Sequence, residues 1–97
     1  MKCYLSGKIT GDPDYIKKFA MYEAFYKKHG LRVVNPAKKG NDKAWDWYMR
    51  RDITLLMKCD AIIMLPDWQE SKGAKLEKHI AEQLRMLFIY AADDKKA

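Results

Sequence analysis

The sequence is poor in cysteine, proline and glycine, with 2, 3 and 5 of them among its 97 residues. Two cysteines, Cys3 and Cys59, cannot form the disulfide framework that stabilises a small secreted domain. They also lack metal-ligand spacing relative to His29 and His79, so we expect no metal site. The cysteine content instead favours two reduced, buried thiols in a cytoplasmic protein.

Long apolar runs are absent as well. The longest spans residues 86–92, whereas a membrane-spanning helix needs about 20 apolar residues. Near the N-terminus, lysine and glycine occur before the apolar core of a signal peptide could form. We therefore expect neither a membrane partner nor a secreted precursor.

Basic residues are numerous, but they form no long basic run. The 19 Lys and Arg against 13 Asp and Glu give a net charge of +6, which favours anionic ligands. The sequence shows neither an aromatic and basic platform nor a helix-turn-helix pattern. The scattered charge therefore favours a small phosphorylated ligand over a nucleic-acid partner.

The remaining composition is typical of one globular domain. Hydrophobic residues make up 48% of the chain and charged residues 33%, which is too apolar for a disordered protein. We assign residues 1–92 to a single domain and residues 93–97 to a charged tail. Apolar patterns and breaker residues predict strands at residues 2–6, 31–34, 60–65 and 86–91, and helices at residues 13–28, 44–58 and 73–85. Asp12 is expected to be the N-cap of the first helix, with Pro13 at its first position.

Strands that alternate with helices predict a parallel sheet with right-handed crossovers. We therefore predict an α/β fold of three layers, in which a four-stranded parallel sheet of flavodoxin-like order 2-1-3-4 has helices on both faces. Ligands bind such sheets at the carboxyl ends of the strands, at the point where the chain reverses direction across the sheet. The loops at residues 6–11 and 66–73 should then flank one crevice.

Two acids lie on helix faces that are otherwise apolar. Glu77 shares a stripe with Ile80 and Leu84, and Asp52 lies within the apolar face of the preceding helix. Because a buried carboxylate is costly unless it is paired or faces a polar cavity, the two acids are candidates for a catalytic pair. In the alternative interpretation, Glu77 caps its own helix and Asp52 pairs with a nearby lysine or arginine. Periodicity alone does not separate the two interpretations.

Polar groups gather at the start of the third helix. Ser71, Lys72 and Gly73 supply a hydroxyl, a cation and free backbone N–H groups, and a helix N-terminus of this kind binds anions readily. Ser71 could equally be an ordinary N-cap. Trp68, in the loop just before, could stack on a base or fill the pocket of an inactive domain.

Three motifs, in this order, resemble those of one enzyme superfamily. Residues 4–9 (Tyr-Leu-Ser-Gly-Lys-Ile) resemble the opening strand and loop of nucleoside 2-deoxyribosyltransferases and of the related 2'-deoxynucleoside 5'-monophosphate N-glycosidases. Asp52, followed at residues 60–63 by Asp-Ala-Ile-Ile, resembles the second helix and third strand of the superfamily. The pattern Ser-x-Gly-Ala-x-x-Glu-x-x-x-Ala at residues 71–81 resembles its signature, in which the glutamate is catalytic. The resemblance covers about residues 2–91 and extends to small members carried mostly by phages and prophages.

The resemblance implies roles for individual residues. Glu77 would attack the anomeric carbon of a deoxyribosyl group and form a covalent glycosyl-enzyme intermediate. Asp52 would hold the sugar or the departing base, or help to move its proton. Ser71, together with Lys72 and Lys8, would contact a 5'-phosphate, which favours a monophosphate substrate. The implied substrate site comprises Tyr4, Ser6, Gly7, Lys8, Ile9, Trp68, Ser71, Lys72 and Gly73, without a cofactor.

The resemblance also implies a homodimer or larger homo-oligomer, because a neighbouring subunit often completes the site in this superfamily. The aromatic residues of the first two helices could supply the interface. In the first helix, helical spacing favours core or subunit contacts for Tyr15, Phe19, Tyr22 and Tyr26. In the second, the candidates are Trp45 and Trp47.

Three functions remain open at this point. The first is an enzyme that cleaves or exchanges the N-glycosidic bond of a deoxynucleotide or deoxynucleoside. The second is a non-catalytic domain that sequesters or senses a nucleotide, for example in a conflict between phage and host. The third, a nucleic-acid-binding protein, is suggested only by the net charge and ranks last.

Overall fold

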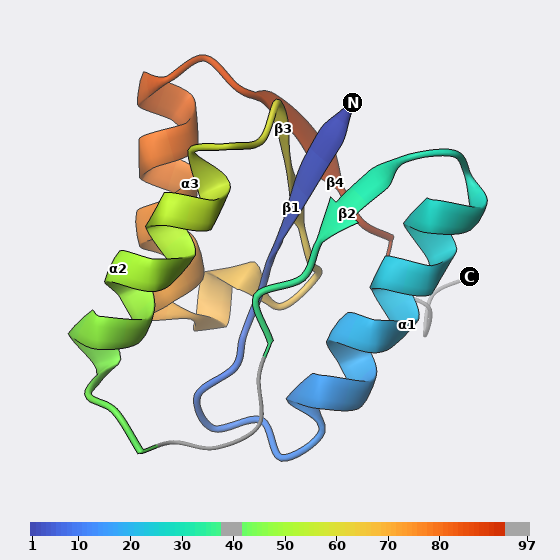
Figure 1. The fold of residues 1–97 in the computed structure, drawn as a ribbon. Coiled ribbons are helices and arrows are strands. Elements are labelled where there is room, and N and C mark those ends of the chain that lie inside the picture. Colours follow the sequence, from blue (N-terminus) through green and yellow to red (C-terminus); the bar gives the residue numbers. More distant parts are fainter. Residues whose placement is uncertain (38–41, 93–97) are drawn as a thin grey trace.

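A computed structural model describes residues 1–37 and 42–92 and confirms the predicted α/β fold. Four parallel strands form one sheet in the order β2-β1-β3-β4 (Figure 1). The strands are β1 (Lys2–Ser6), β2 (Arg32–Val34), β3 (Ala61–Met64) and β4 (Leu87–Tyr90). The helices are α1 (Tyr15–Lys28), α2 (Trp45–Leu56) and α3 (Lys72–Gln83), together with the short 3-10 helix η1 (Trp68–Glu70). The predicted tail at residues 93–97 lies outside the described residues.

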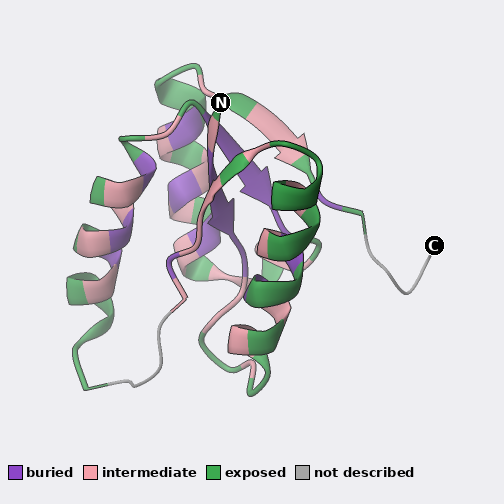
Figure 2. Cartoon of the chain, turned by 45° about the vertical axis from the view of Figure 1, so that its right-hand side comes forward, coloured by how far each residue is buried: buried purple, intermediate pink, exposed green. Residues whose placement is uncertain are grey.

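The helices cover both faces of the sheet, with α1 on one face and α2 and α3 on the other (Figure 1). Successive side chains of a strand point to opposite faces, so β1 contributes to two separate cores. Cys3 and Leu5 pack with Phe19 and Tyr22 of α1. Tyr4 packs on the opposite face, in the cluster that α2 and α3 cover. The two central strands, β1 and β3, are accordingly the most buried part of the sheet (Figure 2).

The aromatic stripe of α1 belongs to the core. Phe19 and Tyr22 are buried, while Tyr15 and Tyr26 pack against the same cluster from its margins. The core reading that helical spacing favoured for this stripe is therefore confirmed. Within the described residues, no helix is long and apolar enough to cross a membrane.

The start of α1 differs from the prediction. Asp12 does not cap the helix, which begins at Tyr15. Its Oδ1 accepts a hydrogen bond from the Asp14 backbone N–H at 2.9 Å, and its Oδ2 lies 2.6 Å from Lys18 Nζ. The ion pair with Lys18 thus holds the carboxylate in the turn before the helix. The other predicted helix and strand ends lie within two residues of the observed ones.

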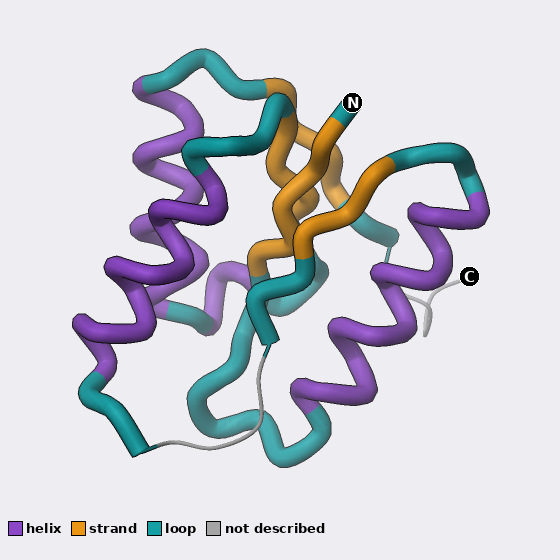
Figure 3. Tube along the Cα trace, viewed as in Figure 1, coloured by secondary structure: helices purple, strands orange, loops and turns teal. Residues whose placement is uncertain are grey.

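The topology places the switch point between β1 and β3. From the carboxyl end of β1 the chain passes to α1, and from the carboxyl end of β3 it passes through η1 to α3 on the opposite face (Figure 3). The two connecting segments therefore diverge at the same edge of the sheet. Side chains from both can line a common space there.

Candidate functional site

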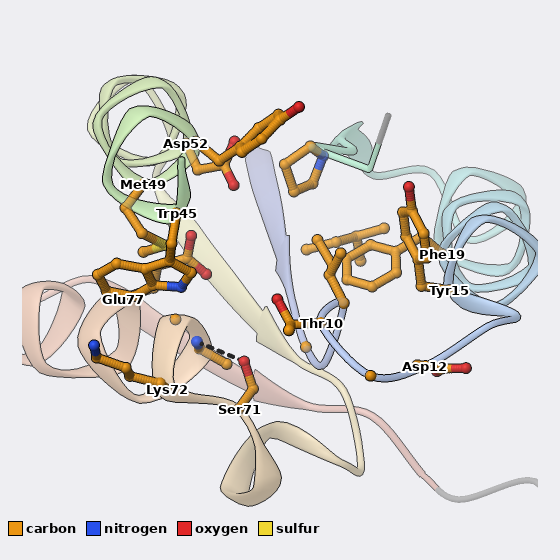
Figure 4. A pocket seen from close by; sticks show the side chains of 18 of the residues that line it. Thr10, Asp12, Tyr15, Phe19, Trp45, Met49, Asp52, Ser71, Lys72 and Glu77 are labelled. Carbon is orange, nitrogen blue, oxygen red and sulfur yellow. Dashed lines mark hydrogen bonds between the residues drawn. The ribbon is translucent and has the colours of Figure 1, made fainter. Parts of the chain in front are cut away.

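A cavity of about 1070 Å³ opens at the switch point. The loop after β1 and the start of α1 form one wall, and α2 and the start of α3 form the other (Figure 4). Both carboxylates singled out in the sequence, Asp52 and Glu77, line this cavity. Asp52 comes from α2 and Glu77 from α3, and the two project from the same wall (Figure 4).

Two hydroxyl groups of β1 hold the Glu77 carboxylate. Tyr4 Oη donates a hydrogen bond to Oε2 at 2.6 Å, and Ser6 Oγ donates one to Oε1 at 2.7 Å. Residues 4 and 6 point to the same face of β1 because side chains alternate along a strand. Glu77 is only 5% exposed. It therefore does not cap its own helix, which excludes the alternative interpretation for this residue.

Burial sets the protonation of Glu77. Desolvation, with a smaller contribution from the charge of Asp52, raises the pKa of this carboxyl from 4.5 to about 7 against the opposing effect of the hydrogen bonds from Tyr4 and Ser6. Burial and the neighbouring Glu77 also raise the pKa of the Tyr4 phenol well above 10. Tyr4 thus remains a neutral donor, while Glu77 gains and loses its proton near neutral pH.

A cationic neighbour holds Asp52. Arg51 donates to Asp52 Oδ1 from Nε at 3.0 Å and from Nη2 at 2.7 Å, and Nη2 also donates to the Pro36 carbonyl at 2.6 Å. Burial raises the pKa of Asp52, whereas the Arg51 guanidinium lowers it. This ion pair is the one that the alternative interpretation predicted for Asp52. Asp52 nevertheless faces the cavity, so the pair does not remove it from the site.

The start of α3 forms part of the cavity wall. Ser71 Oγ accepts a hydrogen bond from the Ala74 backbone N–H at 3.0 Å (Figure 4), which confirms Ser71 as the N-cap of α3. Ser71, Lys72 and Gly73 all line the cavity. A Cβ added at Gly73 would lie 3.0 Å from Met49 Sδ, so glycine allows α2 and α3 to approach closely at this point.

Three residues of the predicted site are not part of the cavity lining: Ser6, Lys8 and Trp68. Trp68 belongs to η1, and its side chain packs against the core cluster between the sheet and helices α2 and α3. Lys78 Nζ lies 5.3 Å from the centroid of that ring. Lys8 Nζ points to Glu70 Oε1, at 3.4 Å. Ser6 is linked to the cavity only by its hydrogen bond to Glu77, whereas Tyr4, Gly7 and Ile9 line the cavity.

Sequence reasoning missed several cavity residues on α2. Trp45, Tyr48 and Arg51 all line the cavity, although Trp45 was expected only as a candidate for a subunit interface. A signal was present, because Trp45 precedes Asp52 by two helical turns and shares its face.

A lysine joins the two loops that flank the cavity. Lys18 Nζ donates to the Lys8 carbonyl at 2.7 Å and to Asp12 Oδ2 at 2.6 Å, and it also bonds Asp67 Oδ2. Asp67 Oδ1 accepts in turn from the Lys8 backbone N–H at 3.0 Å. We call these four residues the Lys18 clasp. It fixes the loop after β1 against the loop after β3.

Comparison with known proteins identifies one family. A family model described as a domain of unknown function (DUF4406) matches residues 1–90. No curated protein matches the sequence. The matched residues include the entire sheet and both cavity carboxylates. Among the described residues, no three His, Cys, Asp or Glu side chains gather as metal ligands would.

Proposed function

The chain belongs to the DUF4406 family, and we propose that this member cleaves or transfers the N-glycosidic bond of a 2'-deoxynucleoside 5'-monophosphate or a deoxynucleoside. One observation carries the proposal. Glu77 is a buried carboxylate at the switch point of a parallel sheet, oriented by two hydroxyl groups and open to a cavity large enough for a nucleotide. The resemblance of residues 4–9 and 71–81 to deoxyribosyltransferases and N-glycosidases supports the same assignment.

In the proposed reaction, Glu77 is the nucleophile. One carboxylate oxygen attacks the anomeric carbon of the deoxyribosyl group from the face opposite the base. The N-glycosidic bond breaks, its electron pair leaves with the base, and a covalent glycosyl-enzyme intermediate forms. Water or a second base then attacks the same carbon and releases Glu77. The hydrogen bonds from Tyr4 and Ser6 fix the carboxylate in one orientation for both steps.

Asp52 has the second role in this mechanism. It faces the cavity from the same wall as Glu77 (Figure 4). Burial raises its pKa, which favours a carboxyl group that can pass a proton to the departing base. Arg51 limits that increase and holds one carboxylate oxygen.

The start of α3 gives one side of the cavity a positive potential. Lys43, Arg51 and Lys72 line the cavity alongside four acids, Asp12, Asp52, Glu70 and Glu77, and the N-terminal turn of α3 adds a positive helix end. Arg51 is engaged by Asp52, so Lys43 and Lys72 supply the charge that remains for a ligand. We therefore propose a 5'-monophosphate in preference to the unphosphorylated nucleoside.

We further propose that the protein acts in the cytoplasm as a homodimer or larger homo-oligomer. The exposed apolar side chains of Met21 and Phe25 on α1 support the assembly. Size-exclusion chromatography with light scattering tests it. A monomer at micromolar concentration would contradict this part of the proposal.

The activity is tested by incubating the protein with each 2'-deoxynucleoside and each 5'-monophosphate, with and without a different free base. Chromatography then follows the release of base or the formation of a new nucleotide. Free base from monophosphates alone identifies a hydrolase, and a new nucleotide only with added base identifies a transferase. Glu77→Gln should abolish either product.

The matched control is Glu82→Gln on the same helix. Glu82 is exposed and pairs with Lys78 outside the cavity, so this variant should keep full turnover. If the folded wild-type protein forms no product from any compound, the catalytic proposal fails. Saturable binding of a nucleotide without product would then favour the alternative, a non-catalytic nucleotide-binding domain.

A further inference from the structure

Trp45 occupies an unusual place for a large apolar side chain. It is the first residue of α2, it lines the cavity, and it is 39% exposed. Lys72 Nζ lies 4.2 Å from the centroid of the indole ring. Such a contact between a cation and an aromatic face is attractive, and it restrains the orientation of the ring.

Trp47, two residues further along α2, provides an internal comparison. It is similarly exposed, at 46%, and Lys43 Nζ lies 5.6 Å from its ring centroid. Trp47 is nevertheless not among the residues that line the cavity. The helical period explains the difference, because Trp45 shares the face of Met49 and Asp52 whereas Trp47 is turned away from it.

The opposite wall of the cavity is also aromatic. Tyr15 and Phe19 of α1 line it across from Trp45 (Figure 4). Glu77 lies on the Trp45 side of the same cavity (Figure 4). A planar group that enters between these walls has aromatic surface on either side and the reactive carboxylate nearby.

We infer that the Trp45 indole, held by the Lys72 ammonium, is the surface on which a purine or pyrimidine base of the ligand stacks. This inference rests on the proposed function, since it assigns the base-contacting residue of the same site. It transfers to Trp45 the stacking role that the sequence had suggested for Trp68, whose ring is packed against the core. Stacking on an aromatic side chain is tolerant of base identity, because every base has a flat face.

The test compares three variants, each made together with Glu77→Gln so that no ligand is consumed. Trp45→Leu removes the aromatic surface, Trp45→Phe keeps part of it, and Trp47→Leu is the matched control on the same helix. Calorimetry measures the affinity for dAMP and dCMP, and for 2-deoxyribose 5-phosphate as the ligand without a base. Thermal unfolding of each variant checks that it is folded.

We expect Trp45→Leu to weaken the binding of dAMP and dCMP by about tenfold or more and to leave the affinity for 2-deoxyribose 5-phosphate unchanged. Trp45→Phe should lie between this variant and its parent, and Trp47→Leu should match the parent. Ligand-induced quenching of tryptophan fluorescence should persist in Trp47→Leu and disappear in Trp45→Leu.

The inference is overturned if Trp45→Leu binds dAMP as tightly as its parent, or if it loses equal affinity for 2-deoxyribose 5-phosphate. Failure of every probe to bind the parent overturns it as well. The fate of the catalytic proposal is read separately from the substrate panel. If the binding of dAMP and dCMP depends on Trp45 but the wild-type protein shows no turnover, the proposed glycosyl chemistry fails and the stacking inference stands.

Discussion

Replacing Glu77 with glutamine should stabilise the protein at neutral and alkaline pH while abolishing turnover. The carboxyl is 5% exposed, and burial raises its pKa from 4.5 to about 7. Its partners, Tyr4 and Ser6, are hydroxyl groups that orient the carboxylate without neutralising it. Glutamine has the shape of the protonated acid and can donate one hydrogen bond to either hydroxyl, so it reproduces the protonated state at every pH.

The direction and size of the effect follow from proton linkage. Between pH 4.5 and about 7, the folded state holds the Glu77 proton more tightly than the unfolded chain does. The free energy of unfolding therefore falls as the pH rises through this window. Below the window both states are protonated and nothing is lost. Above it the loss is complete, and a pKa raised from 4.5 to about 7 corresponds to about 3 kcal/mol.

Urea unfolding at pH 5, 6, 7 and 8 measures this effect. The advantage of Glu77→Gln over the wild type should grow by about 2 kcal/mol or more between pH 5 and pH 8. Glu82→Gln, on the exposed face of the same helix, should follow the wild-type profile. An advantage that is constant from pH 5 to pH 8, or one that Glu82→Gln shares, would refute the reasoning that burial shifts the Glu77 proton.

Three further predictions concern the chemistry and the loops around the site. For the proposed reaction, kcat/KM should rise as Glu77 ionises near pH 7, and a profile that is flat from pH 5.5 to pH 8 would contradict the nucleophile assignment. Lys18→Met should cost about 1–2 kcal/mol of stability and raise KM more than it lowers kcat, because the clasp positions the loop after β1. In a double-mutant cycle with Asp67→Asn, a coupling below about 0.5 kcal/mol would show that the two side chains act independently. Gly7→Ala should lower the free energy of unfolding by about 1–3 kcal/mol, measured as a lower urea midpoint, because a Cβ at residue 7 would lie 2.8 Å from Leu65 Cβ. A loss below about 0.5 kcal/mol would contradict this contact.

The fold could be predicted because short-range pattern and chain handedness together leave few topologies. The nearly unbroken apolar run at residues 60–65 suits a central parallel strand covered on both faces, and every residue of β3 is buried. Right-handed crossovers then lead to the order 2-1-3-4. The start of α1 could not be predicted in the same way. Asp12 is a residue type that often caps helices, but its carboxylate forms an ion pair with Lys18, six residues further on.

The site was predicted where periodicity controls the direction of a side chain. On a helix the spacing determines the face, so Asp52 and Glu77 were identifiable as acids that point inward. In a loop no period exists, and the position of Trp68 depends on the turn of η1 after β3. The contacts of Lys18 with Lys8 and Asp67 join three separate segments. Such contacts depend on how the loops pack against one another, and a local sequence pattern does not predict that packing.

The contrast between the two carboxylates is the strongest physical reason to give Glu77 a chemical role. An acid retained only for structure would be expected to have a cation beside it, as Asp52 has Arg51. The two donors bonded to Glu77 are instead neutral hydroxyl groups, so its charge is oriented but not cancelled. That arrangement lowers the stability of a 97-residue domain at neutral pH by about 3 kcal/mol. Such a loss is characteristic of a site where a reactive group is held ready at the expense of the fold. The same contrast separates the proposed roles, because among the described residues no cation neutralises the Glu77 carboxylate that would attack carbon, whereas Arg51 holds one oxygen of the Asp52 carboxyl.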